Sequence, residues 1–463
     1  MVGRGLDSAV NLIMPPLSKG GGPPKVVEGF LMLFKNISII TPSLEIQNNM
    51  FVGVKGDKID YIGAEKPQEN YGEEYDGTGK VLSSGFVNLH THSPMTLLRG
   101  YAENLPLDRW LNEKVFPFED RLNCDRAYFG TMLSIAEMLS SGTTSFTDMY
   151  FFGDGVMKAV IDSKAKTNFG RSIVSFVDED ITQNERFQEG IYLAKKYHNT
   201  QNGKIKIDMS LHAEYTNRLS IIQQFGEFTN GKDYINHIHL SETKAEHENC
   251  KEKYGKTPAR LFYDAKVLNS PTILAHCVWV EDEDMDIFKE MGATVAHCPA
   301  SNMKLGSGFC NTYKMLQKGV NIGIGTDSAA SNNGLDIMRE MYLAALLPKG
   351  VNNQADIVTP QDIYRMATVN GYKAQGRMDC GEIKVGNRAD LIVIDMATPN
   401  MYPDFDILNN IVYSANKSNV VLTMVDGEVL YKNGEFTTID VERMGYEVSR
   451  LVREVVNEVK SNG

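Results

Sequence analysis

The clearest chemical signal in this sequence is a possible metal-binding pair, His90 and His92. Residues two apart in a β-strand face the same side, so two imidazoles at this spacing can converge on one cation. The preceding residues, Gly85, Phe86 and Val87, predict a buried apolar strand, where histidines without polar partners would be costly. A polar pair on an exposed strand face is the alternative interpretation.

Two further candidates follow along the chain. His239 ends an apolar run and would complete a three-histidine set, which some catalytic zinc sites use while leaving one position open for water. Glu242, three residues later, is a candidate proton carrier, although His-x-x-Glu pairs are also common on surfaces. Asp327 ends a glycine-containing apolar run and could be a ligand and general base, or alternatively a helix cap or turn residue.

A repeated β/α arrangement would bring these residues together. Apolar, β-branched runs alternate with longer helical stretches such as Asp125 to Leu139, a pattern typical of a parallel sheet. Eight strands are predicted to end near His90/His92, Asp148, Val177, His212, His239, His276, His297 and Asp327. In a (β/α)8 barrel the catalytic residues lie at the carboxyl ends of the strands. The candidates, each ambiguous alone, therefore predict one metal site together.

Both ends of the chain carry short β-like runs outside this barrel, with turns at Gly56-Asp57 and Asp426-Gly427 that are typical of a small antiparallel sheet. The predicted fold class is therefore α/β: a (β/α)8 TIM-type barrel with a second small β-sandwich domain built from both chain ends. The predicted divisions are an extension or leader at 1–31, β-sandwich at 32–84, metal-dependent catalytic barrel at 85–385, β-sandwich again at 386–436, and a C-terminal helix at 437–463.

Composition narrows the classes of partner. The 463 residues carry 47 Lys+Arg against 59 Asp+Glu, a formal charge of −12, and no long basic block, which argues against nucleic acid or an anionic membrane. The sequence has no uninterrupted apolar run of about 18 residues, so no membrane span is predicted. Six scattered cysteines without a C-x-x-C pair favour a reduced, cytoplasmic enzyme. We expect a small-molecule substrate.

A series of motifs spans the chain from about Met32 to Phe436. They are Asn88 to His92, His239 with Glu242, Ala275 to Cys277, His297 to Asn302, Gly325 to Asp327, and Gly386 to Leu391. In this order they resemble the metal-dependent amidohydrolase superfamily. Three more segments, Ser93 to Ala102, Leu107 to Leu111 and Phe116 to Glu119, are similar to the 5-methylthioadenosine/S-adenosylhomocysteine deaminases.

This resemblance implies hydrolytic deamination at C6 of an adenine nucleoside, S-adenosylhomocysteine and/or 5'-methylthioadenosine, giving the inosine analogue and ammonia. It implies one divalent metal ion per subunit, with zinc favoured, although iron, nickel or manganese would accept the same ligands. The implied ligands are His90, His92, His239 and Asp327. A homo-oligomer, dimer or tetramer, is also expected.

The resemblance also implies roles around the metal. His276 would hold the attacking hydroxide and the developing oxyanion, Asp327 would act as the base, and Glu242 would carry a proton to the purine. The implied substrate-binding residues are Trp110, Glu119, Arg186, His212 and Glu242, with Glu119 accepting hydrogen bonds from the ribose hydroxyls and Arg186 and His212 meeting the distal part of the substrate.

Several alternatives stay open at this stage. Arg171 competes with Arg186 as the partner of a substrate carboxylate, since a guanidinium at either position could pair with it. The segment around His212 departs from the family pattern, because Leu211 stands where a proline is usual and Glu214 adds acidic character. His297 is expected to support the site without binding metal, and His237 to lie in packing.

Two other functions are compatible with these residues. The same metal chemistry could act on another aromatic amine or halide, such as guanine, a pyrimidine or an s-triazine. Substitution of Glu119 would distinguish these substrates from a nucleoside, because only a nucleoside offers it a ribose. A barrel that has lost its chemistry is the second alternative, which the presence of all four ligands and Glu242 disfavours.

Overall fold

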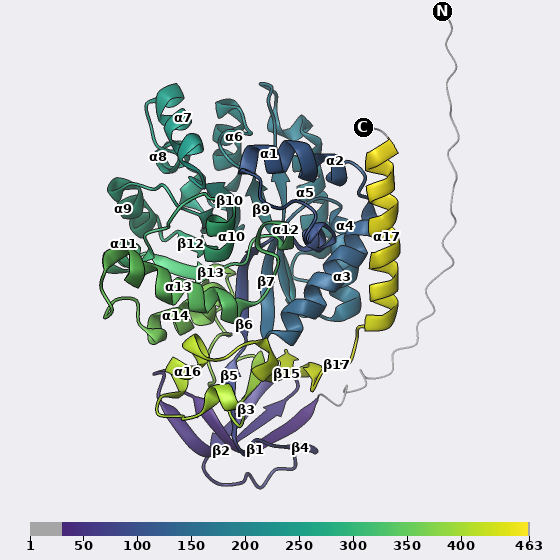
Figure 1. The fold of residues 1–463 in the computed structure, drawn as a ribbon, viewed down its shortest axis with the longest axis vertical. Helices are drawn as coiled ribbons and strands as arrows, with labels where there is room; N and C mark the ends of the chain where they lie inside the picture. Colours follow the sequence, from purple (N-terminus) through teal and green to yellow (C-terminus); the bar gives the residue numbers. More distant parts are fainter. Residues whose placement is uncertain (1–29, 462–463) are drawn as a thin grey trace, which may run out of the picture.

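The computed structural model describes residues 30–461 (Figure 1). The extension predicted at 1–31 therefore falls almost entirely outside the described residues, and Leu31 already opens the first strand.

Eight parallel strands form the barrel and follow one another in chain order around it. They are β6 (Phe86–Thr91), β7 (Thr143–Met149), β8 (Thr167–Ile173), β9 (Ile205–Leu211), β10 (Asn236–Leu240), β11 (Thr272–His276), β12 (Thr294–His297) and β13 (Asn321–Ile324). Beyond β13, the N–H groups of Thr326 and Asp327 donate to the carbonyl oxygen of His90 at 3.1 and 2.9 Å. These bonds connect the segment after the last strand to the first strand. The predicted TIM-type barrel is confirmed.

Two strands end earlier than predicted, and one of them is β13, which ends at Ile324, three residues before Asp327. The third strand ends at Ile173, four residues before Val177. Val174, Phe176 and Val177 add apolar residues after the strand, but Phe176 and Val177 are exposed in the loop that follows. Apolar composition alone thus extended the predicted strand into a loop at the mouth of the barrel.

Helices cover the outside of the barrel (Figure 1). Those between and after the strands are α3 (Cys124–Ser140), α4 (Gly153–Ser163), α5 (Glu185–Tyr197), α6 (Leu219–Thr229), α7 (Lys244–Tyr254), α8 (Pro258–Asp264), α9 (Asp282–Met291), α10 (Pro299–Lys304), α11 (Thr312–Lys318), α12 (Ala329–Asn332), α13 (Ile337–Asn352), α14 (Pro360–Ala367) and α15 (Val369–Ala374). The helix predicted over Asp125–Leu139 is α3, which begins after Asn123 because that side chain accepts the N–H of Arg126.

The second sheet, at the lower end of the view in Figure 1, combines strands from both chain ends. From the first part come β1 (Leu31–Ile40), β2 (Ile46–Lys55), β3 (Lys58–Gly63), β4 (Glu73–Asp76) and β5 (Lys80–Ser84); from the second come β14 (Leu391–Asp395), β15 (Val420–Val425), β16 (Glu428–Lys432) and β17 (Glu435–Phe436). The two parts join where β14 pairs with β5. The sheet is mixed, because β1 runs parallel to β4 and β5, so the antiparallel prediction is wrong there.

The two predicted turns of this sheet meet each other. Gly427 has a φ of +78°, and a Cβ at this position would lie 1.9 Å from the carbonyl oxygen of Gly56. Only glycine allows this close approach, so the turns at the two ends of the chain are packed directly together.

A buried ion cluster connects the sheet to the barrel. The ammonium of Lys166, at the start of the barrel's third strand, pairs with Asp390 and, at 2.6 Å, with Asp426. All three side chains are almost fully buried, so removing one partner would leave an uncompensated charge in the interior.

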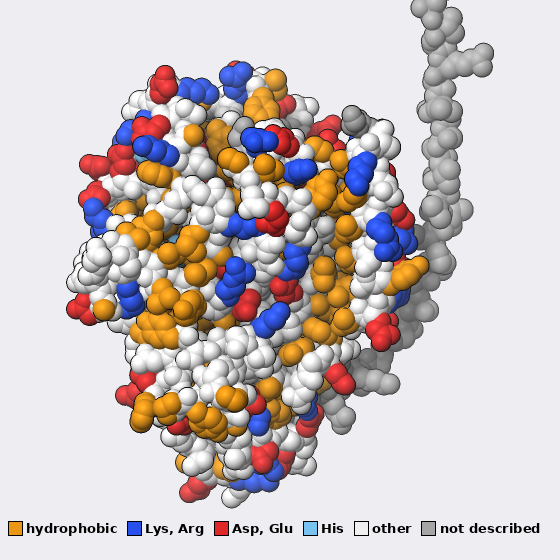
Figure 2. Space-filling model, in the orientation of Figure 1, with side chains coloured by type: hydrophobic (Ala, Val, Ile, Leu, Met, Phe, Trp, Pro, Cys, Tyr) orange, Lys and Arg blue, Asp and Glu red, His pale blue; other side chains and the backbone are white. Residues whose placement is uncertain are grey.

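The remaining helices are α1 (Leu107–Trp110), α2 (Phe116–Glu119), α16 (Ile407–Tyr413) and α17 (Val441–Ser461). The last runs along α3 (Figure 1), burying Met444, Leu451 and Val455, as its apolar stripe predicts. Within residues 30–461 no helix is long and apolar enough to cross a membrane. On the face shown in Figure 2, acidic and basic side chains are interspersed.

Candidate active site

A cavity of about 630 Å³ opens at the carboxyl ends of the barrel strands. Nine of the ten predicted site residues line it: His92, Trp110, Glu119, Arg186, His212, His239, Glu242, His276 and Asp327. The tenth, His90, is fully buried beside them. A cavity of this size is in the range of small-molecule sites.

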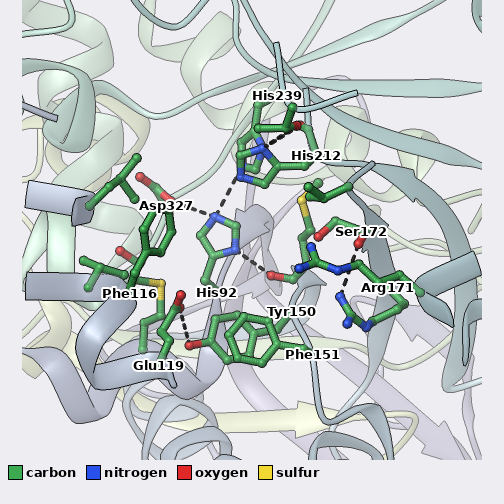
Figure 3. Close-up of a pocket in the computed structure, with 18 of the residues that line it drawn as sticks. His92, Phe116, Glu119, Tyr150, Phe151, Arg171, Ser172, His212, His239 and Asp327 are labelled. Atoms are coloured by element: carbon green, nitrogen blue, oxygen red, sulfur yellow. Dashed lines mark hydrogen bonds and ion pairs between the residues drawn. The ribbon is translucent and has the colours of Figure 1, made fainter. Parts of the chain in front are cut away.

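Imidazole nitrogens and one carboxylate converge at the base of this cavity. The Nε2 atoms of His92 and His239 lie 3.3 Å apart, and the Asp327 Oδ1 atom is 3.3 Å from His92 Nε2 and 3.6 Å from His90 Nε2. Two overlapping sets bring their possible ligand atoms within 4.8 Å of one another: His90, His239 and His276, and His90, His92 and Asp327. Figure 3 shows His92 between Asp327 and His239.

These groups fit a divalent cation. His90 Nε2 is buried and has no hydrogen-bond partner among the described residues, although it faces the other ligand candidates. An orphaned imidazole nitrogen beside a carboxylate and other imidazoles is unfavourable unless a shared cation satisfies their lone pairs. Three imidazoles and one carboxylate are donors that zinc and similar divalent metals accept.

Two of the histidines are held in orientation by hydrogen bonds from the ring nitrogen that points away from the cluster. Nδ1 of His92 donates to the carbonyl oxygen of Met149 at 2.5 Å, and Nδ1 of His239 donates to that of His212 at 2.8 Å. Because these protons sit on Nδ1, both Nε2 lone pairs face the centre of the cluster, the tautomer a metal ligand needs. The hydroxyls of Ser301 and Ser331 donate to the other carboxylate oxygen of Asp327 in the same way.

Residues at or just after the ends of three barrel strands have left-handed backbone conformations. Ser241, His276 and Asp327 have φ values of +47°, +72° and +58°. Such conformations are unfavourable for residues with a side chain and are concentrated at functional sites, where the surrounding structure maintains them. Here they turn the chain sharply at the ends of β10, β11 and β13.

Glu242 and His276 form a second polar pair in the cavity. Glu242 Oε2 lies 3.8 Å from His276 Nε2, while the Ser307 hydroxyl donates to Glu242 Oε1 at 3.2 Å. Burial raises the pKa of Glu242, so this carboxyl group can hold a proton more readily than an exposed glutamate. The Nδ1–H of His276 donates to Asn302 Oδ1 at 2.9 Å, which directs its Nε2 toward Glu242.

One short helical segment covers the outer cavity: α1, a π-helical turn over Leu111–Val115, and α2. Trp110 is almost fully buried there, and its indole N–H has no partner among the described residues. Glu119 accepts a hydrogen bond from the Tyr150 hydroxyl at 2.6 Å, below His92 in Figure 3. Burial raises the pKa of Glu119 to about 7, although the Tyr150 bond opposes the shift.

The two competing arginines differ in their surroundings. Arg171 donates through Nε to Glu189 Oε2 at 2.5 Å, so a carboxylate of the protein already neutralises it. The Arg186 guanidinium, at the start of α5, also lines the cavity but has no hydrogen bond or ion pair to a described residue. Arg186 is therefore the cation that is available to an anionic ligand.

The structure also shows contacts of the candidate residues that the sequence did not predict. His237, expected in packing, is hydrogen-bonded to His90, and the signal was present because His237 and His239 share a strand face. Tyr150 follows the second strand and Asn302 closes the His297 motif, but nothing in the sequence pairs them with Glu119 and His276. His297 belongs to neither ligand set and does not line the cavity, so its supporting role stays a prediction.

Comparisons with known proteins agree with this geometry. The model of the amidohydrolase family matches residues 81–430. The 5-methylthioadenosine/S-adenosylhomocysteine deaminase of Dictyoglomus thermophilum is 39% identical over 92% of this chain and 99% of its own length. The 5'-deoxyadenosine deaminase of Methanosarcina mazei is 37% identical over 93% of this chain and 99% of its own.

A solved structure, an adenosine deaminase from Xanthomonas campestris with bound zinc, superposes with a TM-score of 0.86. It has 28% identity and covers 94% of this chain and 99% of the other. The structure has the barrel with a cluster of imidazoles and a carboxylate at its mouth, and the relatives span almost the whole chain. The protein therefore belongs to the amidohydrolase family.

Proposed function

We propose that this protein is a metal-dependent deaminase that removes the C6 amino group of an adenine nucleoside by hydrolysis. The substrate is S-adenosylhomocysteine, 5'-methylthioadenosine or both. The observation that carries the proposal is the presence, in one cavity, of the imidazole and carboxylate cluster, the proton carrier Glu242 and the half-buried Glu119. Relatives 36–41% identical to this chain are named for the same reaction on these nucleosides.

In this proposal His90, His92, His239 and Asp327 hold one divalent cation. Zinc is the favoured ion, because the related adenosine deaminase structure contains it, and iron, nickel or manganese are the alternatives. When bound, the ion supplies Lewis acidity that makes a nearby water acidic enough to lose a proton near neutral pH.

The protein's own side chains then move the protons. Asp327 accepts a proton from the attacking water as its oxygen adds to C6, and Glu242 donates a proton to N1 of the purine. Asp327 then passes the proton it accepted to the amino group, and the C6–N bond breaks so that ammonia leaves. As the C6 carbonyl of the inosine analogue forms, the hydroxyl proton returns to Glu242. His276 faces the developing oxyanion; burial opposes its protonation, but the adjacent Glu242 carboxylate raises the pKa of His276 overall.

A kinetic panel tests this function directly. Adenosine, 5'-methylthioadenosine and S-adenosylhomocysteine are each incubated with protein whose metal content is measured on the same sample. We expect a change at the adenine absorbance band together with released ammonia. Failure of the metal-loaded protein to convert any of the three would overturn the proposal and favour guanine, a pyrimidine or an s-triazine as substrate.

The homo-oligomer stays a prediction, which light scattering of the purified protein tests.

Glu119 is proposed to accept hydrogen bonds from the ribose hydroxyls. Replacing it by glutamine, Glu119→Gln, is expected to raise KM for the nucleoside about 10- to 100-fold with a smaller effect on kcat, since a hydrogen bond to a charged group contributes about 1.5–3 kcal/mol. Steady-state kinetics on 5'-methylthioadenosine measure this split. Unchanged KM in the variant would show that no ribose is bound there.

The same residue predicts a pH dependence. Because Glu119 has a pKa of about 7 in the free protein, with Tyr150, His92, Asp120 and Arg186 around it, it is neutral at lower pH and a charged acceptor above. Substrate affinity is therefore expected to rise as pH increases through about 7 and then level off. A KM profile from pH 5.5 to 8.5 measures it, and the rise should disappear in Glu119→Gln; a rise that persists in that variant belongs to another group.

Arg186 and His212 are proposed to meet the distal part of the substrate. Arg186→Gln is expected to raise KM for S-adenosylhomocysteine about 10- to 100-fold while leaving 5'-methylthioadenosine within about twofold, because only the first carries a carboxylate for the free guanidinium. Arg171→Gln is the matched control, since Glu189 already pairs with that side chain. A selective loss in Arg171→Gln instead would transfer the role to Arg171.

A further inference from the structure

Two buried histidines are hydrogen-bonded to each other behind the cluster. Nδ1 of His90 and Nε2 of His237 lie 2.9 Å apart, with the rings at 89° to each other, and neither side chain is exposed. His237 lies on β10, two residues before His239, and faces the barrel interior with it. The bond therefore connects the first barrel strand to the fifth.

Only one direction of this bond is compatible with a metal ligand at His90. A bond between two neutral imidazoles has one N–H donor and one lone-pair acceptor. If His90 offers its Nε2 lone pair to a cation, its proton lies on Nδ1 and is donated to His237 Nε2. His237 then carries its own proton on Nδ1, a buried atom that has no partner among the described residues.

The reverse direction would disable His90. A proton on His237 Nε2 would be donated to His90 Nδ1, and the His90 proton would move to Nε2. That nitrogen has no hydrogen-bond acceptor among the described residues, since the Asp327 carboxylate oxygen is 3.6 Å away. A protonated Nε2 has no lone pair for a metal, so the direction of the bond decides whether His90 can be a ligand.

His90 differs in this respect from two other proposed ligands. His92 and His239 donate to backbone carbonyl oxygens, which can only accept and so fix the tautomer. His237 can donate or accept. We propose that His237 is a positioning residue that holds His90 in the Nδ1-protonated tautomer and thereby sets the affinity of the site for its cation. The inference rests on the metal site proposed above.

The test compares two variants of similar side-chain size, His237→Gln and His237→Met. Glutamine offers a carbonyl oxygen that can accept from His90 Nδ1, whereas the methionine thioether is only a weak acceptor. His198→Met is the control for loss of an imidazole outside the ligand sets and the cavity, since His198 is hydrogen-bonded to the backbone of Ile207. Each chelator-treated protein is titrated with Zn²⁺ against a competing chelator, and circular dichroism checks that it is folded.

We expect His237→Met to weaken Zn²⁺ binding about 10- to 100-fold, the usual effect of losing a hydrogen-bond partner behind a ligand. His237→Gln and His198→Met should stay within about threefold of the unsubstituted protein. Nitrogen-15 NMR should show His90 protonated on Nδ1 in the unsubstituted protein and in His237→Gln, and a tautomer mixture in His237→Met. Equal losses in His237→Gln and His237→Met, or a folded His237→Met with full affinity, would overturn the inference. An unsubstituted protein that binds no Zn²⁺ would instead refute the proposed metal site.

Discussion

Replacing Glu242 with glutamine is expected to lower kcat about 10³-fold while metal content stays that of the unsubstituted protein. The side chain keeps its shape and its contact with the Ser307 hydroxyl, but it can no longer hold and release the proton that N1 of the purine requires. A positioned general acid contributes about 10²- to 10⁴-fold to rate. Measuring kcat and KM on 5'-methylthioadenosine with the metal analysed in the same sample checks the result.

Ser307→Ala is the matched control for this prediction. It removes one hydrogen bond to Glu242 and leaves the carboxyl group able to transfer a proton, so a loss of less than about tenfold in kcat is expected. If Glu242→Gln retained more than a tenth of the original kcat, the proton would have to come from another group. His276, whose Nε2 lies 3.8 Å from Glu242, would then be the first to substitute.

Asp327→Asn is expected to reduce kcat at least about 10³-fold and also to weaken metal binding. The change is nearly isosteric, but it removes the negative charge that faces His90 and His92 at 3.6 and 3.3 Å and the base that accepts a proton from water. This double effect distinguishes Asp327 from Glu242, whose substitution should leave the metal in place. Metal titration and steady-state kinetics on the same preparation measure both parts.

A substitution at a hydrogen-bond partner of Asp327 tests the position of its carboxylate while its charge is kept. Ser331→Ala removes one donor to Asp327 Oδ2, while Ser301 still donates to the same oxygen. We expect a loss of less than about tenfold in kcat with full metal content. A fully active, metal-loaded Asp327→Asn protein would contradict both proposed roles of this residue.

Much of the fold could be predicted from local patterns. The alternation of apolar strands with helical stretches is a property of neighbouring residues, and it predicted the barrel and placed α3 within a residue or two. The spacing of His90 and His92 depends only on the two-residue period of a strand, so their common face follows from sequence alone. The side chains predicted for the cavity lie together because a closed barrel brings all strand ends to one rim.

Other features depend on contacts between distant parts of the chain. The parallel pairing of β1 with β5, the early end of β8 at Ile173 and the buried Lys166 cluster depend on which surfaces are covered in the folded protein. Local composition carries no information about such neighbours, so the sequence predicted an antiparallel sheet and a longer strand. The choice between Arg186 and Arg171 was open for the same reason, because only the fold brings Glu189 to Arg171.

The amino-acid sequence by itself therefore determined the kind of protein and the chemical types at its site: imidazoles and carboxyl groups at the ends of parallel strands. The tertiary structure decided how those groups are held, through His237 behind His90, Tyr150 against Glu119 and the serines behind Asp327. The physical reason is that the type of a side chain is given by the sequence, whereas its hydrogen-bond partner, protonation and tautomer are set by the neighbours that the folded chain places around it.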